Sequence, residues 1–360
     1  MTAIKRYDYM DIAKGIGILM VVWAHILLTG WTHRMIYAFH MPLFFFLSGM
    51  LFKKEKYNTF VSFFVHRAKR LLLPYVIYSV VTWAFWAFFR YMHHDEVSSY
   101  FKPLLQTLIA QGSGEFIVHN SALWFIPCLF LVEILYFSIC KLTKWLRVII
   151  SFGLAALSFI LGNIGGAGYW FSPPWNADAA FIALPFYCVG NLLINEFGHE
   201  RILKCVSNNK SNYIITWLCA TVLLFWSSMA FGECSMGSSS YQCEGWIFII
   251  RAFLGCGWLV LLAILIGNIQ NFNKIVSILI VYLKWAGKKS LDIMCLHIPL
   301  KGVCMIFIAK YLHSNVDKVS DNYFYSLFAF LMTMIGCWLI IRFIVQKVIL
   351  LNSSHLLNKM

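Results

Sequence analysis

Four ionisable side chains stand out near the start of the chain because they lie inside apolar segments: Asp11, Lys14, His25 and His40. A charged side chain in a membrane span is costly unless it faces a partner or a cavity. On a helix that turns by about 100° per residue, Lys14 and His25 differ in direction by only about 20°, so they share one face. They lie about 16 Å apart along the axis. A polar stripe along this segment therefore indicates a functional site.

Two histidines in consecutive apolar segments are typical of acid–base chemistry. His25 comes just before the first segment ends, and His40 comes about four residues after the second begins. The short connection makes the two segments antiparallel neighbours, so we expect the imidazoles at similar depth. A neutral imidazole can remove the proton of a hydroxyl group because its pKa lies nearest neutrality. The alternative is that each histidine only hydrogen-bonds a neighbouring helix.

Lys14 and a later cluster of basic residues suggest a binding site for a phosphate-bearing donor. Lys14 and the cluster Arg67, Lys69 and Arg70 would form its electropositive entrance. Asp11, one turn before Lys14, is the expected ion-pair partner of Lys14. Two other interpretations stay open, since Lys14 could extend its ammonium group to lipid headgroups and the cluster could be a topology signal.

The composition indicates that these residues lie on membrane helices. Of the 360 residues, 61% are hydrophobic and 12% are charged, whereas about a quarter are charged in soluble domains. We expect an all-α polytopic membrane protein with a single transmembrane domain over residues 1–360. Apolar runs of about 20 residues predict ten spans, near residues 10–28, 36–52, 71–89, 121–140, 146–164, 178–195, 212–231, 246–267, 289–311 and 323–345.

The distribution of positive charge predicts the orientation of these spans. Alternate connections carry twenty-one and five of the 29 Lys and Arg residues, and three more lie inside spans. Since cytoplasmic loops are enriched in Lys and Arg, both termini are predicted to be cytoplasmic. The net charge of +14 does not indicate nucleic-acid binding, because the basic residues lie in short clusters between apolar runs.

Three further features of the chain lead to structural predictions. The segment from 274 to 285 is apolar but too short to cross, so we interpret it as an interfacial helix. Cys234 and Cys243 lie in one outward connection and could form a disulfide in an oxidising compartment, although spacing alone does not establish the geometry. The outward loop 165–175 is rich in aromatic residues and fits either an interfacial belt or a platform for the acceptor.

Other polar residues within spans are expected to pair with one another. The sequence does not say which of them pair. They are Glu133, Arg251, Asp292, His297 and Lys301. No pair of cysteines has the spacing of a zinc site, and we expect no metal.

Several blocks of the sequence resemble the membrane-bound acyltransferase family 3, especially its branch of sugar O-acetyltransferases. The two most specific blocks are Tyr9–Ile18 followed by His25, and Phe39–Gly49, which begins Phe-His-Met-Pro. Weaker blocks follow in the same order along the chain. They are Arg67 with Arg70–Tyr75, Leu123–Phe125, Pro185–Tyr187 ahead of Gly190, and Gly287–Leu291 ahead of His297 and Pro299.

The resemblance implies an enzyme with ten membrane helices that passes an acyl group, usually acetyl from acetyl-CoA, to a hydroxyl group of an extracytoplasmic glycan. The family's signature is a basic residue, ten intervening residues and an essential histidine, which here are Lys14 and His25. Many relatives have arginine at the first position, and lysine is a point charge that does not bind phosphate in a bidentate manner. Relatives often carry a soluble domain; this sequence has none after Phe343, so we expect the membrane domain to suffice.

Together these observations predict roles for six residues. His25, His40 and Asp11 would serve catalysis, and Lys14, Arg67 and Arg70 would bind acyl-CoA. We expect the acceptor to be a surface glycan or a lipid-linked saccharide, and the location to be the bacterial cytoplasmic membrane. The acceptor sugar, the acyl group and a homo-oligomeric state stay open.

A transporter or flippase for a small molecule or lipid-linked glycan is the alternative class, because ten helices with buried charges suit it as well. Transporters often contain internal repeats, and the two halves of this sequence share no obvious one. A purely structural membrane subunit would leave the histidines unexplained.

Overall fold

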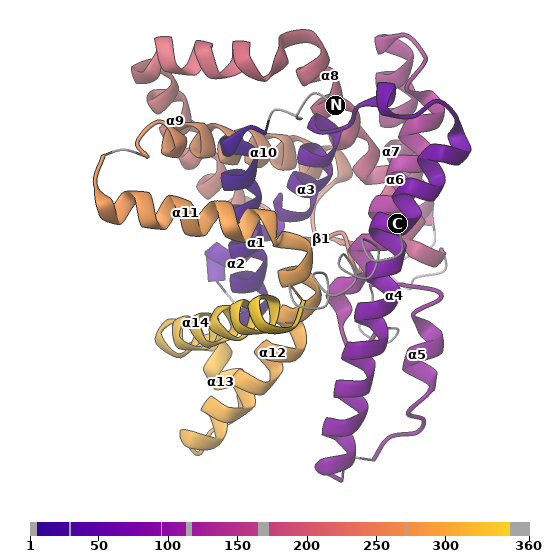
Figure 1. Cartoon of the computed structure of the whole chain (residues 1–360), viewed down its shortest axis with the longest axis vertical. Helices are drawn as coiled ribbons and strands as arrows, with labels where there is room; N and C mark the ends of the chain where they lie inside the picture. The colour runs from indigo at the N-terminus through magenta and orange to yellow at the C-terminus, as the bar shows by residue number, and fades with distance from the viewer. Residues whose placement is uncertain are drawn as a thin grey trace, which may run out of the picture.

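The computed structural model describes residues 6–28, 30–94, 96–112, 117–164, 173–270 and 272–345, and these are almost entirely helical (Figure 1). The helices are α1 (Asp8–Ile26), α2 (Gly30–Tyr37), α3 (His40–Met50), α4 (Phe60–Met92), α5 (Lys102–Gln106), α6 (Phe125–Ile139), α7 (Lys144–Ile164), α8 (Ala177–Asn208), α9 (Lys210–Ala230), α10 (Gly245–Gly267), α11 (Lys274–Lys288), α12 (Ser290–Tyr311), α13 (Val316–Asp321) and α14 (Tyr323–Ile340). Short 3₁₀ turns cover Lys54–Lys56, Ser121–Trp124 and Pro174–Asn176, a π-helical turn covers Ile341–Val345, and strands β1 (Cys234–Ser235) and β2 (Ser240–Tyr241) form a hairpin.

Ten segments of the described chain are long and apolar enough to cross a membrane, which confirms the predicted all-α polytopic fold. Some boundaries differ from those predicted. The third span begins at Phe60 rather than near residue 71, and the second begins at Gly30 because α2 and α3 together form it. His40 is therefore ten residues into its span rather than about four. Helix α2 resembles a loop in the sequence because it contains three consecutive polar residues, Thr32, His33 and Arg34.

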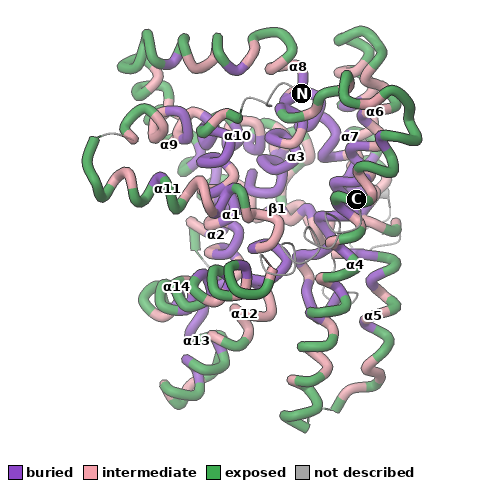
Figure 2. Tube along the Cα trace, in the orientation of Figure 1, coloured by how far each residue is buried: buried purple, intermediate pink, exposed green. Residues whose placement is uncertain are grey.

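The spans form an inner group and an outer group. The most buried ones contain α1, α2 with α3, α6 and α8, whereas α4, α7 and α9 are mostly exposed to the surroundings (Figure 2). Polar side chains on the inner group are shielded from lipid tails. The candidate residues on α1 and α3 thus lie where polar groups can meet partners.

Helix α11 is not among the ten spans and packs closely on α1. A Cβ atom at Gly15 would collide with the backbone of Leu283, and one at Gly287 would collide with the carbonyl of Asp11. Only glycine permits this approach of two backbones. The predicted helix at 274–285 thus exists, runs three residues further, and covers the part of α1 that carries Asp11 and Lys14.

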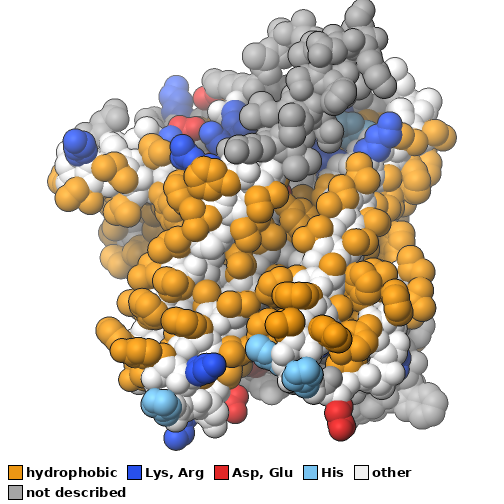
Figure 3. Space-filling model, turned by 60° about the horizontal axis from the view of Figure 1, so that its bottom comes forward, with side chains coloured by type: hydrophobic (Ala, Val, Ile, Leu, Met, Phe, Trp, Pro, Cys, Tyr) orange, Lys and Arg blue, Asp and Glu red, His pale blue; other side chains and the backbone are white. Residues whose placement is uncertain are grey.

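The two ends of the helical bundle differ in charge. At the basic end, Lys284 binds Asp8 at 2.5 Å, Lys144 lies 3.4 Å from Glu196, and a 2.7 Å hydrogen bond joins Tyr9 to His199. At the opposite end, which we call the hairpin end, Asn176 donates to the carbonyl of Gly237 in the β1–β2 turn. Figure 3 shows most of the visible Lys and Arg side chains near one end, with a belt of apolar side chains between the ends.

Candidate functional site

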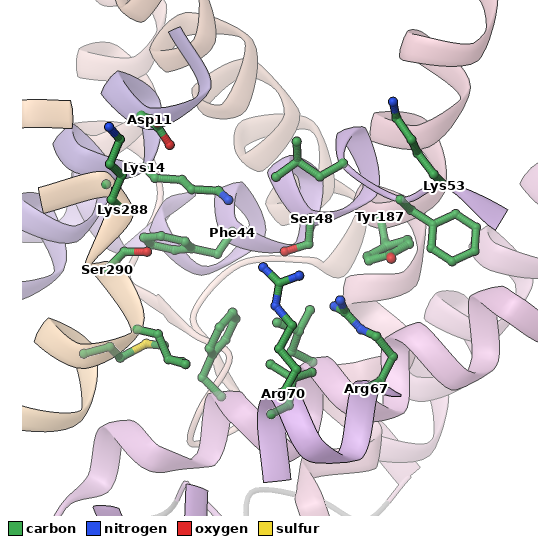
Figure 4. Close-up of a pocket in the computed structure, with 18 of the residues that line it drawn as sticks. Asp11, Lys14, Phe44, Ser48, Lys53, Arg67, Arg70, Tyr187, Lys288 and Ser290 are labelled. Carbon is green, nitrogen blue, oxygen red and sulfur yellow. The ribbon is translucent and has the colours of Figure 1, made fainter. Parts of the chain in front are cut away.

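A cavity of about 280 Å³ opens at the basic end of the bundle. We call it the basic pocket because α1, α4, α11, the segment before α1 and the α3–α4 connection supply seven cationic side chains to its lining. These are Arg6, Lys14, Lys53, Lys56, Arg67, Arg70 and Lys288. Figure 4 shows the charged ends of Lys14, Arg67 and Arg70 turned toward one shared space beside Ser48 and Tyr187. The structure thus brings together the three residues predicted to bind the donor.

The start of α4 sets the position of two of these cations. Thr59 caps the helix, with its hydroxyl group accepting from the backbone of Ser62 while the Ser62 hydroxyl accepts in return. Arg67 and Arg70 follow at a spacing of three residues, so they lie on one face of α4. Arg67 forms a buried ion pair with Glu133 of α6, which supplies the partner of Glu133 that the sequence left open.

Asp11 has a different partner from the one predicted. Its carboxylate accepts two hydrogen bonds from the guanidinium group of Arg6, at 2.6 and 2.8 Å. This hydrogen bond is the main reason that the pKa of Arg6 is raised. A guanidinium group binds a carboxylate through two parallel bonds, which an ammonium group cannot do. The expected Asp11–Lys14 ion pair is therefore wrong, and the ammonium group of Lys14 faces the pocket.

The lining of the basic pocket carries an excess of positive charge. Asp11 is the sole acidic side chain among its described lining residues. Since Arg6 binds Asp11 and Arg67 binds Glu133, the cations with no described ion pair are Lys14, Lys53, Lys56, Arg70 and Lys288. Such a set suits a ligand with several negative charges, such as an organic phosphate.

The inner wall of the basic pocket lies close to histidine residues. Phe44 of α3 and Met294 of α12 line it. His40 comes four residues before Phe44, and His297 comes three residues after Met294, so about one helical turn separates each histidine from the wall. The Phe44 ring packs against Phe125, with ring centroids 6.0 Å apart. An apolar layer thus divides the pocket from the histidines.

Five rings gather between this layer and the hairpin end, and we call them the histidine cluster: His25, His33, Tyr37, His40 and His297. The ring centroid of Tyr37 lies 4.2 Å from that of His33, 4.8 Å from that of His40 and 6.3 Å from that of His25. The centroids of His25 and His297 are 5.2 Å apart. The structure thus brings His25 and His40 together around Tyr37, and it adds a histidine from α12.

The backbone of their own helices fixes the tautomers of two imidazoles. Nδ1 of His40 donates to the carbonyl of Ile36 at 2.9 Å, and Nδ1 of His297 donates to the carbonyl of Met294 at 2.8 Å. In the neutral rings Nε2 then carries no hydrogen and offers a lone pair. Nε2 of His297 is buried and has no hydrogen-bond partner in the described parts of the chain. The cluster therefore presents basic nitrogen atoms beside His25.

His33 is positioned by acceptors on both sides of its ring. Nδ1 donates to the carbonyl of Leu27 at 3.0 Å, and Nε2 lies 3.2 Å from a carboxylate oxygen of Glu233. The imidazolium form satisfies both acceptors at once. The hydrogen bond from His33 holds the pKa of Glu233 below its usual range. His33 thus attaches the cluster to the connection that precedes β1.

Sequence reasoning did not predict that His33 and Tyr37 belong to this cluster, or that Lys301 binds the backbone of His25. His33, Tyr37 and His40 are spaced by four and three residues, the spacing of a helical face, and this signal could have found them. Lys301 is recognised only in three dimensions, because its ammonium group donates to the carbonyl of His25 on another helix, at 2.6 Å.

Two consecutive buried polar residues, His119 and Asn120, come just before the fourth span. Asn120 donates to the carbonyl of Cys295 at 2.6 Å, while its own side-chain oxygen has no partner among the described residues. Both ring nitrogens of the neighbouring His119 are likewise unpartnered there, and burial lowers the pKa of this histidine to about 4. Buried polar atoms without protein partners are uncommon, and these atoms are able to form hydrogen bonds with hydroxyl groups.

The other intramembrane residues have structural partners. Asp292 accepts from Tyr78 at 2.8 Å and lies 3.4 Å from Lys289. Arg251 donates to the carbonyl of Gly232 at 3.1 Å. In the described chain, no group of three or more His, Cys, Asp or Glu side chains has the geometry of a metal site. The aromatic loop lies mostly outside the described residues, which resume at residue 173.

A comparison with protein families decides the class of this molecule. A family model described as an acyltransferase domain, that of acyltransferase family 3, matches residues 7–342. The chain belongs to this family. No significant match was found among curated proteins or among solved structures. The matched region of this acyltransferase includes every residue named in the basic pocket except Arg6, and the whole histidine cluster. With its ten spans, the protein is a multi-pass membrane acyltransferase.

Proposed function

We propose that this acyltransferase moves an acetyl or similar acyl group from acyl-CoA to a hydroxyl group of a cell-surface glycan. The observation that carries the proposal is the arrangement of the basic pocket and the histidine cluster on the same helices. The pocket and the cluster share α1, α3 and α12, and about one turn of α3 and of α12 separates them. A donor that binds from the basic end and an acceptor that enters from the hairpin end would meet at the apolar layer of Phe44 and Phe125.

The donor would bind with its phosphates in the basic pocket. Coenzyme A carries several phosphate charges, and Lys14, Arg70 and Lys288 are cations of the lining with no described ion pair. Arg67 would add a guanidinium group that Glu133 already holds in place. The arm of the coenzyme would pass Phe44 toward His25, spanning the distance of about 16 Å that separates Lys14 from His25 along α1. Asp11 would act indirectly, by holding Arg6 at the pocket.

The chemistry would begin at His25. Its imidazole takes the proton of the acceptor hydroxyl, whose oxygen attacks the thioester carbonyl. The carbon–sulfur bond breaks, an ester forms, and the proton passes from His25 to the sulfur of coenzyme A. Lys301 holds the backbone of His25, and the lone pair of His297 would accept an N–H of His25 and so set its tautomer. His40 would orient the acceptor through its own lone pair.

The acceptor would reach the cluster from the hairpin end. A sugar carries several hydroxyl groups, and the unpartnered atoms of His119, Asn120 and His297 would bind such groups. The basic end would face the cytoplasm, because Lys and Arg are enriched on that side of a membrane. In this orientation the protein would lie in the cytoplasmic membrane of a bacterium, and the acceptor would be a surface glycan or a lipid-linked saccharide.

Analysis of surface glycans tests the proposal directly. Cells with the wild-type protein should yield glycans heavier by one acyl group on modified sugars, and cells with His25→Gln should not. His313→Gln is the matched control, because His313 is exposed between α12 and α13. Unmodified glycan retained inside cells that lack the protein would instead indicate a transporter. Acylation that persists in a correctly inserted His25→Gln variant would falsify the role of His25.

A further inference from the structure

The β1–β2 hairpin brings two cysteines into contact at the hairpin end. Cys234 of β1 and Cys243, two residues beyond β2, have their Sγ atoms 3.1 Å apart. The strands pair Cys234 with Tyr241 and Ser235 with Ser240, and Gln242 donates to the carbonyl of Glu233 at 2.9 Å. The backbone of the hairpin thus holds the two thiols together at its base.

Side chains from three other helices fix this hairpin in place. Asn176 and Asp178, at the start of α8, bind Gly237 and Ser239 of the turn. Arg251 of α10 donates to the carbonyl of Gly232 at 3.1 Å. Glu233, directly before Cys234, binds His33 of α2. The base of the hairpin is therefore one residue away from a contact with the histidine cluster.

The surroundings of Cys243 favour its thiolate form. A hydrogen bond joins its Sγ to that of Cys234, and Arg251 Nη1 lies 3.9 Å from its Sγ. These two neighbours lower the pKa of Cys243 to about 7, and the same hydrogen bond raises that of Cys234. Cys243 is partly exposed, whereas Cys234 is buried. A thiolate that reagents can reach, beside a second thiol, is the arrangement from which disulfides form.

We propose that Cys234 and Cys243 are oxidised to a disulfide that fixes Glu233 against His33. The oxidant is the disulfide of an extracytoplasmic thiol–disulfide oxidoreductase. The thiolate of Cys243 attacks one of its sulfur atoms, which gives a mixed disulfide and releases the other sulfur as a thiol. Cys234 loses its proton and attacks Cys243, so the Cys234–Cys243 bond forms and the oxidant leaves as a dithiol that has received two electrons and two protons.

The covalent bond can be read without any assay of activity. Chymotrypsin cleaves after Tyr241, which lies between the two cysteines, so the resulting peptides remain joined only by a disulfide. The full-length protein is taken from native membranes, alkylated in denaturant without reductant, digested and analysed by mass spectrometry. We expect the peptides to be joined before reduction and to separate after it. Two alkylated, unjoined peptides before reduction overturn the disulfide.

Two variants assign the bond to these sulfur atoms. Cys243→Ser should abolish the joined peptides and leave Cys234 alkylated. Cys205→Ser, which removes an exposed cysteine of α8, should leave the joined peptides unchanged. Joined peptides that persist in Cys243→Ser would show that Cys234 has another partner, which contradicts the proposal.

The effect on the histidine cluster rests on the proposed function and has its own measurement. Reductant should lower the rate of acyl transfer by the wild-type protein several-fold. The Cys234→Ser/Cys243→Ser protein should begin near the lower rate and not respond to reductant. Reductant could separate the joined peptides and yet leave the wild-type rate unchanged. That result would overturn the claim that the disulfide fixes Glu233, but it would not overturn the disulfide itself. Absence of any acyl transfer by the wild type would count against the proposed function alone, because the peptide map is independent of it.

Discussion

The ammonium group of Lys301 donates a hydrogen bond of 2.6 Å to the backbone carbonyl of His25. The last carbonyl groups of a helix have no partner within it, and His25 lies in the last turn of α1. Lys301 satisfies this carbonyl and so attaches α12, with His297, to the end of α1. The relative position of the two imidazoles therefore depends on a hydrogen bond between a side chain of α12 and the backbone of α1.

This relationship predicts that Lys301→Met lowers kcat and leaves the KM for acyl-CoA nearly unchanged. Displacement of a catalytic group by about 1 Å can reduce a rate by up to ~10²-fold, and the basic pocket lies too far away to be affected. Lys301→Arg, which keeps a donor, should recover most of the rate. Steady-state release of the coenzyme A thiol measures both constants, and a Lys301→Met variant altered only in KM would contradict the positioning role.

Arg70→Gln should weaken donor binding without changing the stability of the fold. Arg70 is exposed at the basic pocket and has no described ion pair. Loss of a charge-assisted hydrogen bond to a phosphate group is worth about 1.5–3 kcal/mol, so the KM for acyl-CoA should rise about 10- to 100-fold. Lys69→Gln, on the same turn but absent from the pocket lining, is the matched control. Equal effects of both variants would show that only the general positive charge matters.

Arg67→Gln should lower the stability of the fold in addition to weakening donor binding. It leaves the buried carboxylate of Glu133 without its partner, and an unpaired buried charge destabilises a protein by about 3–5 kcal/mol. The melting temperature in detergent should fall clearly, and Arg67→Gln/Glu133→Gln should restore most of it. If the double variant is as unstable as Arg67→Gln, the ion pair is not the source of the loss.

Phe44→Ala should allow acyl-CoA to be hydrolysed without transfer of the acyl group to an acceptor. The ring of Phe44 lies between the basic pocket and His40, and its removal gives water and the thioester free access to the histidine cluster. We expect faster release of coenzyme A in the absence of an acceptor. Phe46→Ala, a buried position of the same helix outside the pocket lining, controls for general loosening. No increase in this hydrolysis would show that Phe44 does not form the barrier.

The pH dependence of cysteine alkylation tests the electrostatics of the hairpin. In the reduced protein, the thiolate fraction of Cys243 should rise with pH through its pKa of about 7, while Cys234 should react only at much higher pH. The rate of iodoacetamide labelling at each cysteine measures this difference. Arg251→Gln removes a neighbouring cation and should move the Cys243 midpoint upward. A midpoint near the ordinary thiol pKa in the wild type would contradict the described geometry.

The sequence predicted what depends on local composition. The ten spans follow from the need to bury about 20 apolar residues each, and the shared face of Asp11 and Lys14 follows from helical periodicity. The donor residues Lys14, Arg67 and Arg70 were recognised from charge and from family blocks, and they do line one pocket. Their catalytic and binding roles remain predictions.

What the sequence could not supply were partners across helices. Arg6, which lies just before α1, binds Asp11 in place of Lys14, and helical periodicity does not encode that contact. The pairing of Glu133 with Arg67 depends on how α4 and α6 are rotated. His33 was assigned to the connection between the first two spans because three polar residues in a row resemble a loop, yet it belongs to a helical span.

The apolar layer, where Phe45 packs beside Phe44 and Phe125, has a consequence for the cell as well as for the enzyme. The centroid of Phe125 lies 5.0 Å from that of Phe45 and 6.0 Å from that of Phe44. A continuous water-filled passage through this bundle would conduct protons between two aqueous compartments. Apolar constrictions exclude water and ions unless they are forced open. By keeping the basic pocket separate from the histidine cluster, the layer would preserve the electrical insulation of the membrane.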